Sequence, residues 1–512
     1  MDIQAVYEHL AETPLLPWLV ELHRHACAGV RMLVKAASQS LAEQLAERFA
    51  ERIRSRLLAP GTRLPSVRQC AQQQGVSPST VVAAYDRLLA QGLVEAHRNR
   101  GFFIRNQLVV HTDIAYAATN NIVNKEAATR PERPAAMPHV PVDATALIRG
   151  MFHDRGGQPQ PGMGAFPSEW LETHFMSAAV RRFCTGTELK ALSLHYGEPA
   201  GDLGLRQALA SRLSALGIAA TPQQLITTVG ATHALDMVSR SFLRAGDFVM
   251  VEEPGWAVEF ARLDALGMRV LPVPRGPDGP DLAVMARYCE LHRPKLFVSV
   301  SVFHNPTGYC LSASHAHRLL QLANTHDFYV VEDDTYSHIA PDHATRVCAL
   351  DGLQRSIYVS GFAKILAPGW RVGYLAAPVA WVERLLDTKL LGTLTSPALF
   401  EKALAWCMTQ GQLRRHALQL RARLDRARGR SVALALNAGC RFAAPPAGLF
   451  GWVDTGVDTD ALAQRMLDKG YLLAPGALFH ANHAPSTLMR INFCTTQEAA
   501  FWQVFAQVRD AM

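Results

Sequence analysis

Residues 358–378 read YVSGFAKILAPGWRVGYLAAP, and this stretch decides how the C-terminal two thirds of the chain are interpreted. An apolar run leads to Lys364, a Pro-Gly turn follows, and Arg371 comes seven residues after the lysine. The apolar neighbours of the lysine favour its neutral form, because desolvation disfavours an ammonium. The layout suits a lysine that condenses with an aldehyde beside an arginine that binds a phosphate. A single lysine at a strand end is more often a surface residue, so the rest of the chain has to decide between the two.

The length and composition indicate a multidomain globular protein. The chain has 512 residues and a formal net charge of +7, and ~150 residues per domain predict two or three domains. No run reaches the ~18 apolar residues of a transmembrane helix, and the charges within residues 1–41 argue against a signal peptide. Nine scattered cysteines without a CxxC pair indicate free thiols in a reducing compartment. We therefore expect a cytoplasmic protein without a metal site or a membrane partner.

Much of the positive charge lies between Ser38 and Asn106. This segment holds ten arginines, no lysine and five acidic residues. A basic block of this kind points to a polyanion as the partner. Charge alone fits an ordinary solvated face at least as well, so the interpretation depends on the pattern of helices and turns in the same segment.

That pattern predicts a helix-turn-helix followed by a hairpin. Apolar residues at every fourth position from Leu41 to Leu57 predict an amphipathic helix. Ser66 is placed to cap a short second helix that Gly75 ends in the left-handed conformation. Ser77 is placed to cap a third helix, which would lie in the major groove of DNA. Two apolar runs on either side of the basic residues 97–100 predict a β-hairpin wing.

Three motifs in this segment resemble the winged helix-turn-helix of the GntR family of bacterial regulators: PGTRLPSVR at 60–68, GVSPSTVV at 75–82, and AYDRL with QGLVEA within 84–96. The resemblance implies a set of residues that contact DNA, namely Arg63, Ser66, Arg68, Ser79, Thr80, Arg98 and Arg100. Ala83 departs from the pattern, since many members have a basic residue there, and this predicts fewer base contacts. Arg87 fits a helix-face charge as well as a DNA contact.

Two segments around this domain carry no recognisable motif. Residues 1–37 are expected to form a helical extension of unknown role. Residues 107–147 are rich in Pro, Ala and Asn and lack periodicity, which predicts a linker. Such a linker either lets two domains move or lies along the surface of the second domain. We expect the winged domain at 38–106 and the second domain at 148–512.

The second domain reads as an α/β fold. Short, nearly continuous apolar runs alternate with helix-length segments, which predicts a mostly parallel sheet covered on both faces. The expected strands are 225–228, 248–252, 269–273, 295–300, 328–332 and 357–360. Ligands of such sheets bind at the carboxyl ends of the strands.

Polar motifs stand at five of these expected ends. Gly230 to His233 lie where a strand becomes a helix, which is a phosphate-binding position. The others are Trp256 after an expected strand, the turn His304-Asn-Pro-Thr-Gly308, the pair Asp333 and Tyr336, and the pair Lys364 and Arg371. In this order the five motifs resemble the fold type I aminotransferases, which depend on pyridoxal phosphate, over about 350 residues. That resemblance also implies a small C-terminal α+β subdomain.

The resemblance implies a role for each residue. Lys364 would form the internal aldimine, and Asp333 would keep the pyridine nitrogen protonated, so that the ring acts as an electron sink. Asn305 and Tyr336 would bind the 3-oxygen of the ring and Trp256 would stack on its face. The amides of Ala231 and Thr232 would bind the phosphate together with Arg371.

Two further roles follow from the same resemblance. Tyr196 matches a tyrosine that reaches the phosphate of a neighbouring subunit, which implies a homodimer. Arg490 matches the arginine that binds the substrate carboxylate, although a strand arginine in a surface ion pair is the alternative. The pattern departs at Gly361, where Ser or Thr usually binds the phosphate. Ser360, one residue earlier, is retained as a candidate, although an extended strand would turn it to the other face.

A GntR-like domain joined to an aminotransferase-like domain resembles the MocR type of bacterial transcription regulator. The first hypothesis is therefore a regulator of an operator in double-stranded DNA, which senses pyridoxal phosphate itself, a small amine or an amino acid through the aldimine. Ligand binding would shift the arrangement of a dimer. The alternative is an active aminotransferase of amino acids that carries an accessory DNA-binding domain, because every catalytic part is present. A purely structural role fits poorly with so many matched polar residues.

Overall fold

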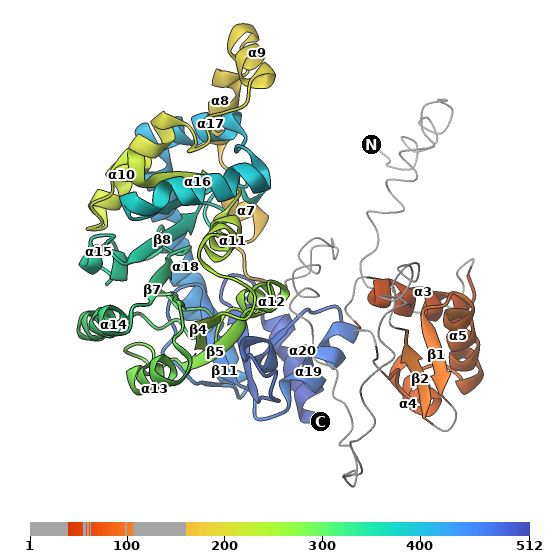
Figure 1. Cartoon of the computed structure of the whole chain (residues 1–512). Helices are drawn as coiled ribbons and strands as arrows, with labels where there is room; N and C mark the ends of the chain where they lie inside the picture. The colour runs from red at the N-terminus through yellow and green to blue at the C-terminus, as the bar shows by residue number, and fades with distance from the viewer. Residues whose placement is uncertain (1–38, 55–57, 59–60, 62, 98–99, 106–159) are drawn as a thin grey trace, which may run out of the picture. The chain divides into compact units, whose positions relative to one another are not determined.

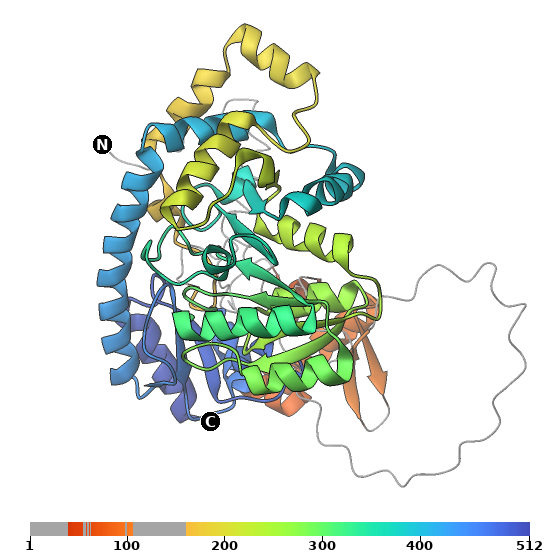
Figure 2. The ribbon, with the colours of Figure 1, turned by 60° about the vertical axis from the view of Figure 1, so that its left-hand side comes forward.

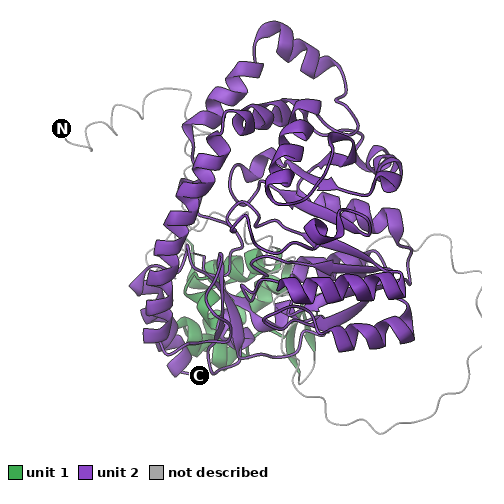
Figure 3. Ribbon diagram, turned by 90° about the vertical axis from the view of Figure 1, so that its left-hand side faces the viewer, with its two compact units in different colours: residues 1–158, 464–472 green, residues 159–463, 473–512 purple. Residues whose placement is uncertain are grey.

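The computed structural model describes residues 39–54, 58, 61, 63–97, 100–105 and 160–512. The chain divides into two compact units, one of residues 1–158 with 464–472 and one of residues 159–463 with 473–512 (Figure 3). The expected extension 1–37 and the expected linker 107–147 lie outside the described residues, as do Leu57 and Arg98.

The first unit contains three helices and a hairpin. They are α3 Leu41–Arg54, α4 Val67–Gln74, α5 Pro78–Ala90, β1 Val94–His97 and β2 Gly101–Ile104. Ser66 and Gln69 form a capping box at the start of α4, and Gly75 ends that helix with φ 64°. The Ser77 hydroxyl accepts a hydrogen bond from the Thr80 amide at the start of α5. These local signals confirm the predicted helix-turn-helix.

A small apolar core holds the three helices and the hairpin together. Residues Leu45, Val81 and Leu88 are fully buried in one cluster with the hairpin residue Ile104. Tyr85 lies in the same core, and its hydroxyl donates to the carbonyl of Pro65 at 2.9 Å. This bond ties the third helix to the turn that precedes α4.

The second unit is built on a seven-stranded sheet (Figure 1). In spatial order the strands are β3 Leu225–Thr228, β9 Gly373–Ala376, β8 Ser356–Gly361, β7 Tyr329–Asp333, β6 Leu296–Ser299, β4 Phe248–Glu253 and β5 Arg269–Pro274. All neighbours are parallel except those of β9, which runs antiparallel to both β3 and β8. The mostly parallel sheet is confirmed.

Helices cover both faces of this sheet, because successive strand residues point in opposite directions. Val249 and Val298 belong to one apolar cluster, whereas Met250 and Phe297 belong to another. The first cluster packs against α11 Ala231–Phe242, α12 Ala257–Ala265 and α16 Val379–Thr393. The second packs against α13 Leu282–His292, α14 Ala313–His326 and α15 Val347–Asp351. Figure 1 shows α13 and α14 on one side of the strands and α11 on the other.

A smaller C-terminal part follows the 26-residue helix α18 Gln412–Asn437, which runs along one side of the unit in Figure 2. Its antiparallel sheet has the order β10 Arg441–Phe442, β11 Phe450–Asp454, β13 Leu488–Asn492 and β12 Ala474–Pro475. The helices of this part are α19 Thr459–Asp468 and α20 Ala499–Asp510. The remaining helices of the unit are α7 Ser168–Leu171, α8 His174–Phe183, α9 Gly186–Leu194, α10 Leu203–Ala215 and α17 Ala398–Thr409. The expected α+β subdomain is thus present.

Two features are absent from the described residues. None of the helices there combines the length and the apolar character that crossing a bilayer requires. No group of three or more His, Cys, Asp or Glu side chains within the same ranges is arranged to hold a metal ion.

Gly75 offers a test of the helix-turn-helix. Its Cβ position is open, with no heavy atom within 4 Å, so a substitution there adds backbone strain and no clash. Gly75→Ala should destabilise the α4–α5 unit by ~1 kcal/mol, because a non-glycine residue resists the left-handed conformation. Amide hydrogen exchange in α4 and α5 of the full-length protein should then rise about fivefold. Gly75→Asn is the control and should show a smaller rise, since Asn tolerates this conformation; equal effects would contradict the argument.

Candidate functional site

The sheet brings the predicted residues to one edge, because the carboxyl ends of β4, β6, β7 and β8 meet there. Asp333 is the last residue of β7, and its register partner on β8 is Val359. Lys364 follows the end of β8, so both residues reach the same edge. Trp256 follows β4 and Asn305 lies in the loop after β6. The same local pattern places each of these side chains, because each apolar strand ends at the candidate residue or is followed by a loop that carries it.

Lys364 is the predicted reactive residue of this arrangement. Its Nζ donates a hydrogen bond to the carbonyl of Gly164 at 2.5 Å. Burial, together with the charges of Arg490 and Arg371, lowers the pKa of the Lys364 amine to about 8, while the charge of Asp333 acts in the opposite direction. An amine with this pKa is neutral in a useful fraction at physiological pH, which an attack on an aldehyde requires.

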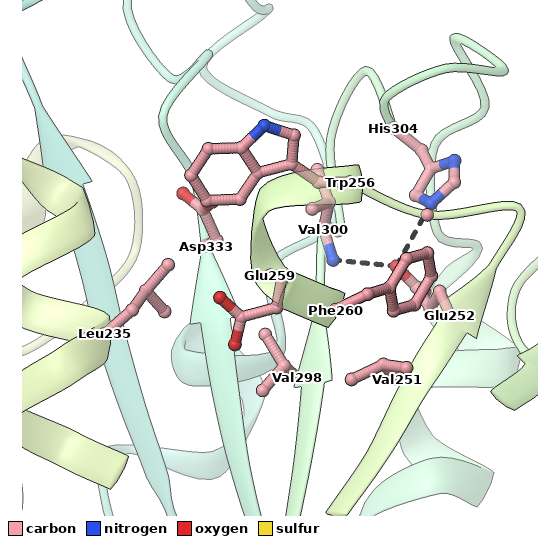
Figure 4. Close-up of a pocket in the computed structure, with 11 residues that line it drawn as sticks. Leu235, Val251, Glu252, Trp256, Glu259, Phe260, Val298, Val300, His304 and Asp333 are labelled. Carbon is pink, nitrogen blue, oxygen red and sulfur yellow. Dashed lines mark hydrogen bonds and ion pairs between the residues drawn. The ribbon is translucent and has the colours of Figure 1, made fainter. Parts of the chain in front are cut away.

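Asp333 lies at the mouth of a pocket beside Trp256. Figure 4 shows the indole of Trp256 next to the Asp333 carboxylate, with His304 across the pocket. Burial raises the pKa of Asp333 to about 6, whereas hydrogen bonds from the amide and hydroxyl of Thr335 favour the charged form. The carboxylate is therefore ionised near pH 7 and can pair with a protonated ring nitrogen. Thr335 had no sequence signal other than its position two residues after the aspartate.

The predicted phosphate position is the N-terminus of α11. Gly230 precedes the helix with φ 80°, and no side chain caps the free amides. Arg371 donates from Nη2 to the carbonyl of Val229 at 3.2 Å. A Cβ on Gly230 would lie 2.5 Å from that same Nη2, and one on Gly373 would lie 2.6 Å from the Ala231 amide nitrogen. Close backbone approach thus joins the amides of Ala231 and Thr232 to the Arg371 guanidinium, and only glycine allows it.

The structure corrects the candidate role of Ser360. Its hydroxyl is fully buried and donates to the carbonyl of Asp334 at 2.8 Å, on the face of β8 turned away from the helix terminus. Gly361 instead faces α11, and a Cβ built there would lie 3.4 Å from the Ala231 amide nitrogen. Strand alternation is the reason, because adjacent residues point to opposite faces. Ser360 is therefore not placed to bind a phosphate at α11.

Arg490 is a buried cation and not a surface residue. Its side chain lies over the rings of Phe450 and Phe479, at 4.3 and 5.1 Å from their centroids. Nη1 donates to Asn305 Oδ1 at 3.0 Å and Nη2 to the carbonyl of Gly162 at 2.6 Å. Burial lowers the pKa of the guanidinium to about 10. Both acceptors are uncharged, so this arrangement leaves the positive charge available to a carboxylate.

Tyr336 completes the inner part of the site. It is buried, and its ring meets Phe450 edge-on at 5.8 Å. Burial raises the pKa of its hydroxyl, against the effect of the Arg490 charge. The phenol therefore stays protonated and can donate to a ring oxygen.

The segment Gln160–Phe166 was missed by sequence reasoning. Its carbonyls at Gly162 and Gly164 accept from Arg490 and Lys364, and the amide of Asn492 donates to those of Met163 and Ala165. The segment carries no motif, since backbone carbonyls do the binding. A signal did exist for Asn492, which lies two residues after Arg490 on β13 and so shares its face.

Tyr196 lies apart from these residues within the described part of the chain. It follows α9 and is 82% exposed. The expected contact with a neighbouring subunit stays a prediction.

The DNA-facing candidates fall into two groups. The arginines Arg63, Arg68 and Arg100 are exposed. The hydroxyls of Ser66, Ser79 and Thr80 take part in the helix caps: Ser66 bonds Gln69, and the other two lie 2.8 Å from the Ser77 hydroxyl. Arg87 pairs with Glu43 of α3 at 2.7 Å, which accounts for it as a helix-face charge.

The comparisons with known proteins agree with this site. Residues 176–501 match the family model "Aminotransferase class I and II", and residues 41–104 match "Bacterial regulatory proteins, gntR family". The chain belongs to the aminotransferase class I and II family. Its pairing of the two domains is that of a MocR-type regulator.

Relatives of both kinds are found. An uncharacterized HTH-type transcriptional regulator of Bacillus subtilis, YisV, is 24% identical over 85% of this chain and 89% of its own length. The probable rhizopine catabolism regulatory protein MocR of Rhizobium meliloti is 31% identical over 62% and 61%. The 2-aminoadipate transaminase of Thermus thermophilus is 29% identical over 68% and 86%. The solved structure of LysN from Thermus thermophilus has a TM-score of 0.65 at 24% identity and covers 71% of this chain and 94% of LysN.

The donor set fits the cofactor that the family implies. Free amides and an arginine suit a phosphate, Asp333 suits a pyridinium, and an amine of low pKa suits an aldehyde. The family and the site together indicate pyridoxal phosphate as the cofactor.

The lowered pKa of Lys364 predicts the pH dependence of cofactor loading. Because only the neutral amine attacks the aldehyde, a pKa of about 8 predicts a rate that rises about fivefold from pH 7 to 8 and less than about twofold from pH 8 to 9. An unperturbed lysine would rise about tenfold over each step. Stopped-flow absorbance of apoprotein with pyridoxal phosphate measures this, with Nα-acetyl-lysine as the reference for the cofactor's own ionisation. A tenfold rise in each of the two steps, about a hundredfold from pH 7 to 9, would contradict the buried site.

The position of Gly361 predicts a gain of affinity on substitution. Gly361→Ser places a hydroxyl beside the amides of α11, where it can donate to a phosphate, and should tighten the binding of pyridoxal phosphate about three- to tenfold. Gly361→Ala is the matched control and should give no gain, because it adds the Cβ without a donor. Equilibrium titration of the apoproteins compares the two. Equal affinities of the Ser and Ala variants would show that this position does not face the phosphate.

Proposed function

We propose that this protein is a transcription regulator that binds double-stranded DNA through its winged domain and responds to a ligand bound at its pyridoxal phosphate site. The observation that carries the proposal is the presence in one chain of exposed arginines on a helix-turn-helix and a complete set of cofactor-binding groups. A second copy of the chain is the expected partner, with Tyr196 of each copy reaching the other.

Each predicted site residue of the large unit has a role in the proposed response. The cofactor supplies an electrophilic aldehyde and a ring that withdraws electrons. Lys364 would hold the aldehyde carbon, Asp333 would keep a proton on the ring nitrogen, and Arg371 with the α11 amides would bind the phosphate. Asn305 and Tyr336 orient the ring oxygen. Arg490 stands ready for the carboxylate of an incoming amino acid.

The winged unit supplies the DNA contacts. The exposed cations Arg63, Arg68 and Arg100 give it phosphate-binding capacity, with Arg98 as the further candidate on the wing. Ser79 and Thr80 lie at the start of α5, the end that enters the major groove in this motif. The caps occupy the serine and threonine hydroxyls, so we assign most of the affinity to the arginines.

A working aminotransferase is the second candidate function, favoured by one observation. Lys364, Asp333 and Arg490, the residues that the reaction of an amino acid would use, are all present in the chain, and burial shifts the pKa of each. Gly361 weighs in the other direction, because it removes a hydroxyl from the phosphate position. Steady turnover of an amino acid and a keto acid at ~1 per second or faster would favour the enzyme.

The decisive experiment is a titration of the full-length protein on the DNA upstream of its own coding region. Binding is measured with and without pyridoxal phosphate and with each of a panel of amino acids and amines. A regulator should bind with an affinity, half-site preference or bend that changes with ligand. A winged dimer that neutralises ~6–10 phosphates should lose ~10³–10⁵ in affinity between about 50 and 200 mM salt. Salt-insensitive or absent binding would leave the enzyme as the better account.

Arg68 and Arg87 form a matched pair for the winged domain. Arg68→Gln should weaken binding similarly on all DNA sequences and reduce the slope of log affinity against log salt by ~0.9, the value for one phosphate contact. Arg87→Gln should change the slope little, because Arg87 is already paired with Glu43. Filter-binding or anisotropy assays over a salt series measure both. Equal slopes for Arg68→Gln and the unchanged protein would remove Arg68 from the interface.

A further inference from the structure

The backbone of the segment Gln160–Phe166 accepts hydrogen bonds from two cations of the predicted cofactor site, Lys364 and Arg490. Four consecutive carbonyls, from Gly162 to Ala165, accept hydrogen bonds from three side chains. Those of Gly162 and Gly164 accept from Arg490 at 2.6 Å and Lys364 at 2.5 Å. The carbonyls of Met163 and Ala165 accept from the side-chain Nδ2 of Asn492 at 3.0 and 2.7 Å. The segment is therefore held by alternate residues on its two sides.

The bonds on the two sides of the segment differ in whether a ligand of the site would compete with them. Lys364 and Arg490 are the groups that a cofactor and a carboxylate would use, whereas Asn492 and Thr495 face only the segment and its surroundings. Thr495 donates from Oγ1 to the carbonyl of Gln160 at 3.1 Å, and the Asn492 amide N–H donates to the carbonyl of Pro161 at 3.0 Å. One set of bonds anchors the segment to β13, and the other set competes with ligands.

Glycine at 164 matters to this arrangement. A Cβ on Gly164 would point between the two cations, 3.7 Å from Arg490 Nη2 and 3.8 Å from Lys364 Nζ. The backbone of the segment thus lies against the space between the lysine and the arginine, with no side chain in between. A ligand that binds both residues must meet this backbone.

We propose that Gln160–Phe166 is a ligand-displaced tether, which an α-carboxylate releases from Arg490 and a plain amine does not. The inference rests on the proposed function, because the same segment continues into residues 106–159, through which the chain reaches the winged domain. It deepens that function by assigning the effector to the class of amines that carry a carboxylate.

The physical reason is the strength of the competing acceptors. A carboxylate binds a guanidinium through two parallel, charge-assisted bonds, which are roughly twice as strong as bonds to a neutral carbonyl. Arg490 is buried over two aromatic rings, its bonded acceptors carry no charge, and its Nε lacks a partner. The bonds that a carboxylate forms with Arg490 are therefore stronger than the bond to the Gly162 carbonyl that they replace. An amine without a carboxylate engages Lys364's side of the site and leaves the Arg490 bond in place.

The cofactor alone is expected to remove the other bond. Bound pyridoxal phosphate would occupy the Lys364 amine, so the lysine would no longer donate to Gly164, and Arg490 would remain as the ligand-sensitive contact. A carboxylate on Arg490 would then remove that second contact. The segment would be held only by the bonds from Asn492 and Thr495, and its amides would exchange faster.

Hydrogen exchange on the full-length, cofactor-loaded protein tests the tether. The probes are L-alanine, L-phenylalanine and L-lysine, each compared at saturating concentration with its decarboxylated amine: ethylamine, 2-phenylethylamine and 1,5-diaminopentane. The reporters are the amide of Met163, which bonds the Gln160 carbonyl, and the amide of Asn492. At least one amino acid should speed exchange at Met163 about tenfold while its amine changes it less than about twofold. Equal effects of acid and amine, or no effect of any of the three amino acids, would overturn the proposal.

A pair of variants separates the tether from the fold. Thr495→Val removes the donor to Gln160 and should raise the resting exchange at Met163 several-fold, with the absorbance of the bound cofactor unchanged. Thr495→Ser keeps the hydroxyl and should behave like the unchanged protein. Unaltered exchange in Thr495→Val would show that the segment is held by other means, which contradicts the assigned anchor.

DNA binding measured in the same samples tells this inference apart from the proposed function. Faster exchange with an amino acid and an unchanged DNA affinity would support the tether and overturn regulation by ligand. A DNA affinity that responds to amino acids while exchange in the segment stays constant would overturn the tether and leave the regulator intact.

Discussion

An excess of buried positive charge is the constraint on which the large unit depends. Lys364 and Arg490 both lie within 4 Å of the Cβ position of Gly164. The charge of Arg371 also acts on the lysine, and Asp333 is the carboxylate that acts on it in the opposite direction. Burying cations without counter-charges is costly, so such a site is stabilised by anions. A phosphate at α11 and a carboxylate at Arg490 would supply them. In the structure, the uncharged oxygens of Gly162, Gly164 and Asn305 accept the hydrogen bonds of these cations in place of an anion.

The same constraint explains how the strands are used. The strands of the large sheet are apolar along most of their length, and Asp333 and Lys364 stand at or just beyond the ends of β7 and β8. Arg490 lies within β13 of the smaller sheet. Glycines do the complementary work, because Gly230 and Gly373 bring β9, Arg371 and the start of α11 within contact distance. The rigid sheet fixes the lysine and the aspartate, whereas the smaller sheet contributes Arg490 and Asn492.

Sequence patterns predicted most of this, and the reason is that the relevant signals are local. Caps at Ser66 and Ser77 and the apolar runs of the sheet determine their own elements, so the winged fold and the strands could be read without a structure. Ser360 failed as a candidate because its role depends on which face of β8 meets α11. Gln160–Phe166 could not be found at all, since its carbonyls are common to every residue type and only the tertiary fold brings them to Arg490.

The balance between regulator and enzyme follows from the same geometry. An enzyme needs its substrate-binding cation free between turnovers. A segment whose backbone binds Arg490 in the cofactor-loaded protein weakens the binding of a carboxylate by the free energy of that hydrogen bond. For a regulator the same competition is useful, because a ligand changes an equilibrium only as far as it distinguishes two arrangements. A tether whose bonds are lost on binding provides that distinction directly. The free energy needed to break the bonds of the segment would slow a catalyst. In a regulator, the same free energy difference would separate the two arrangements between which a ligand selects.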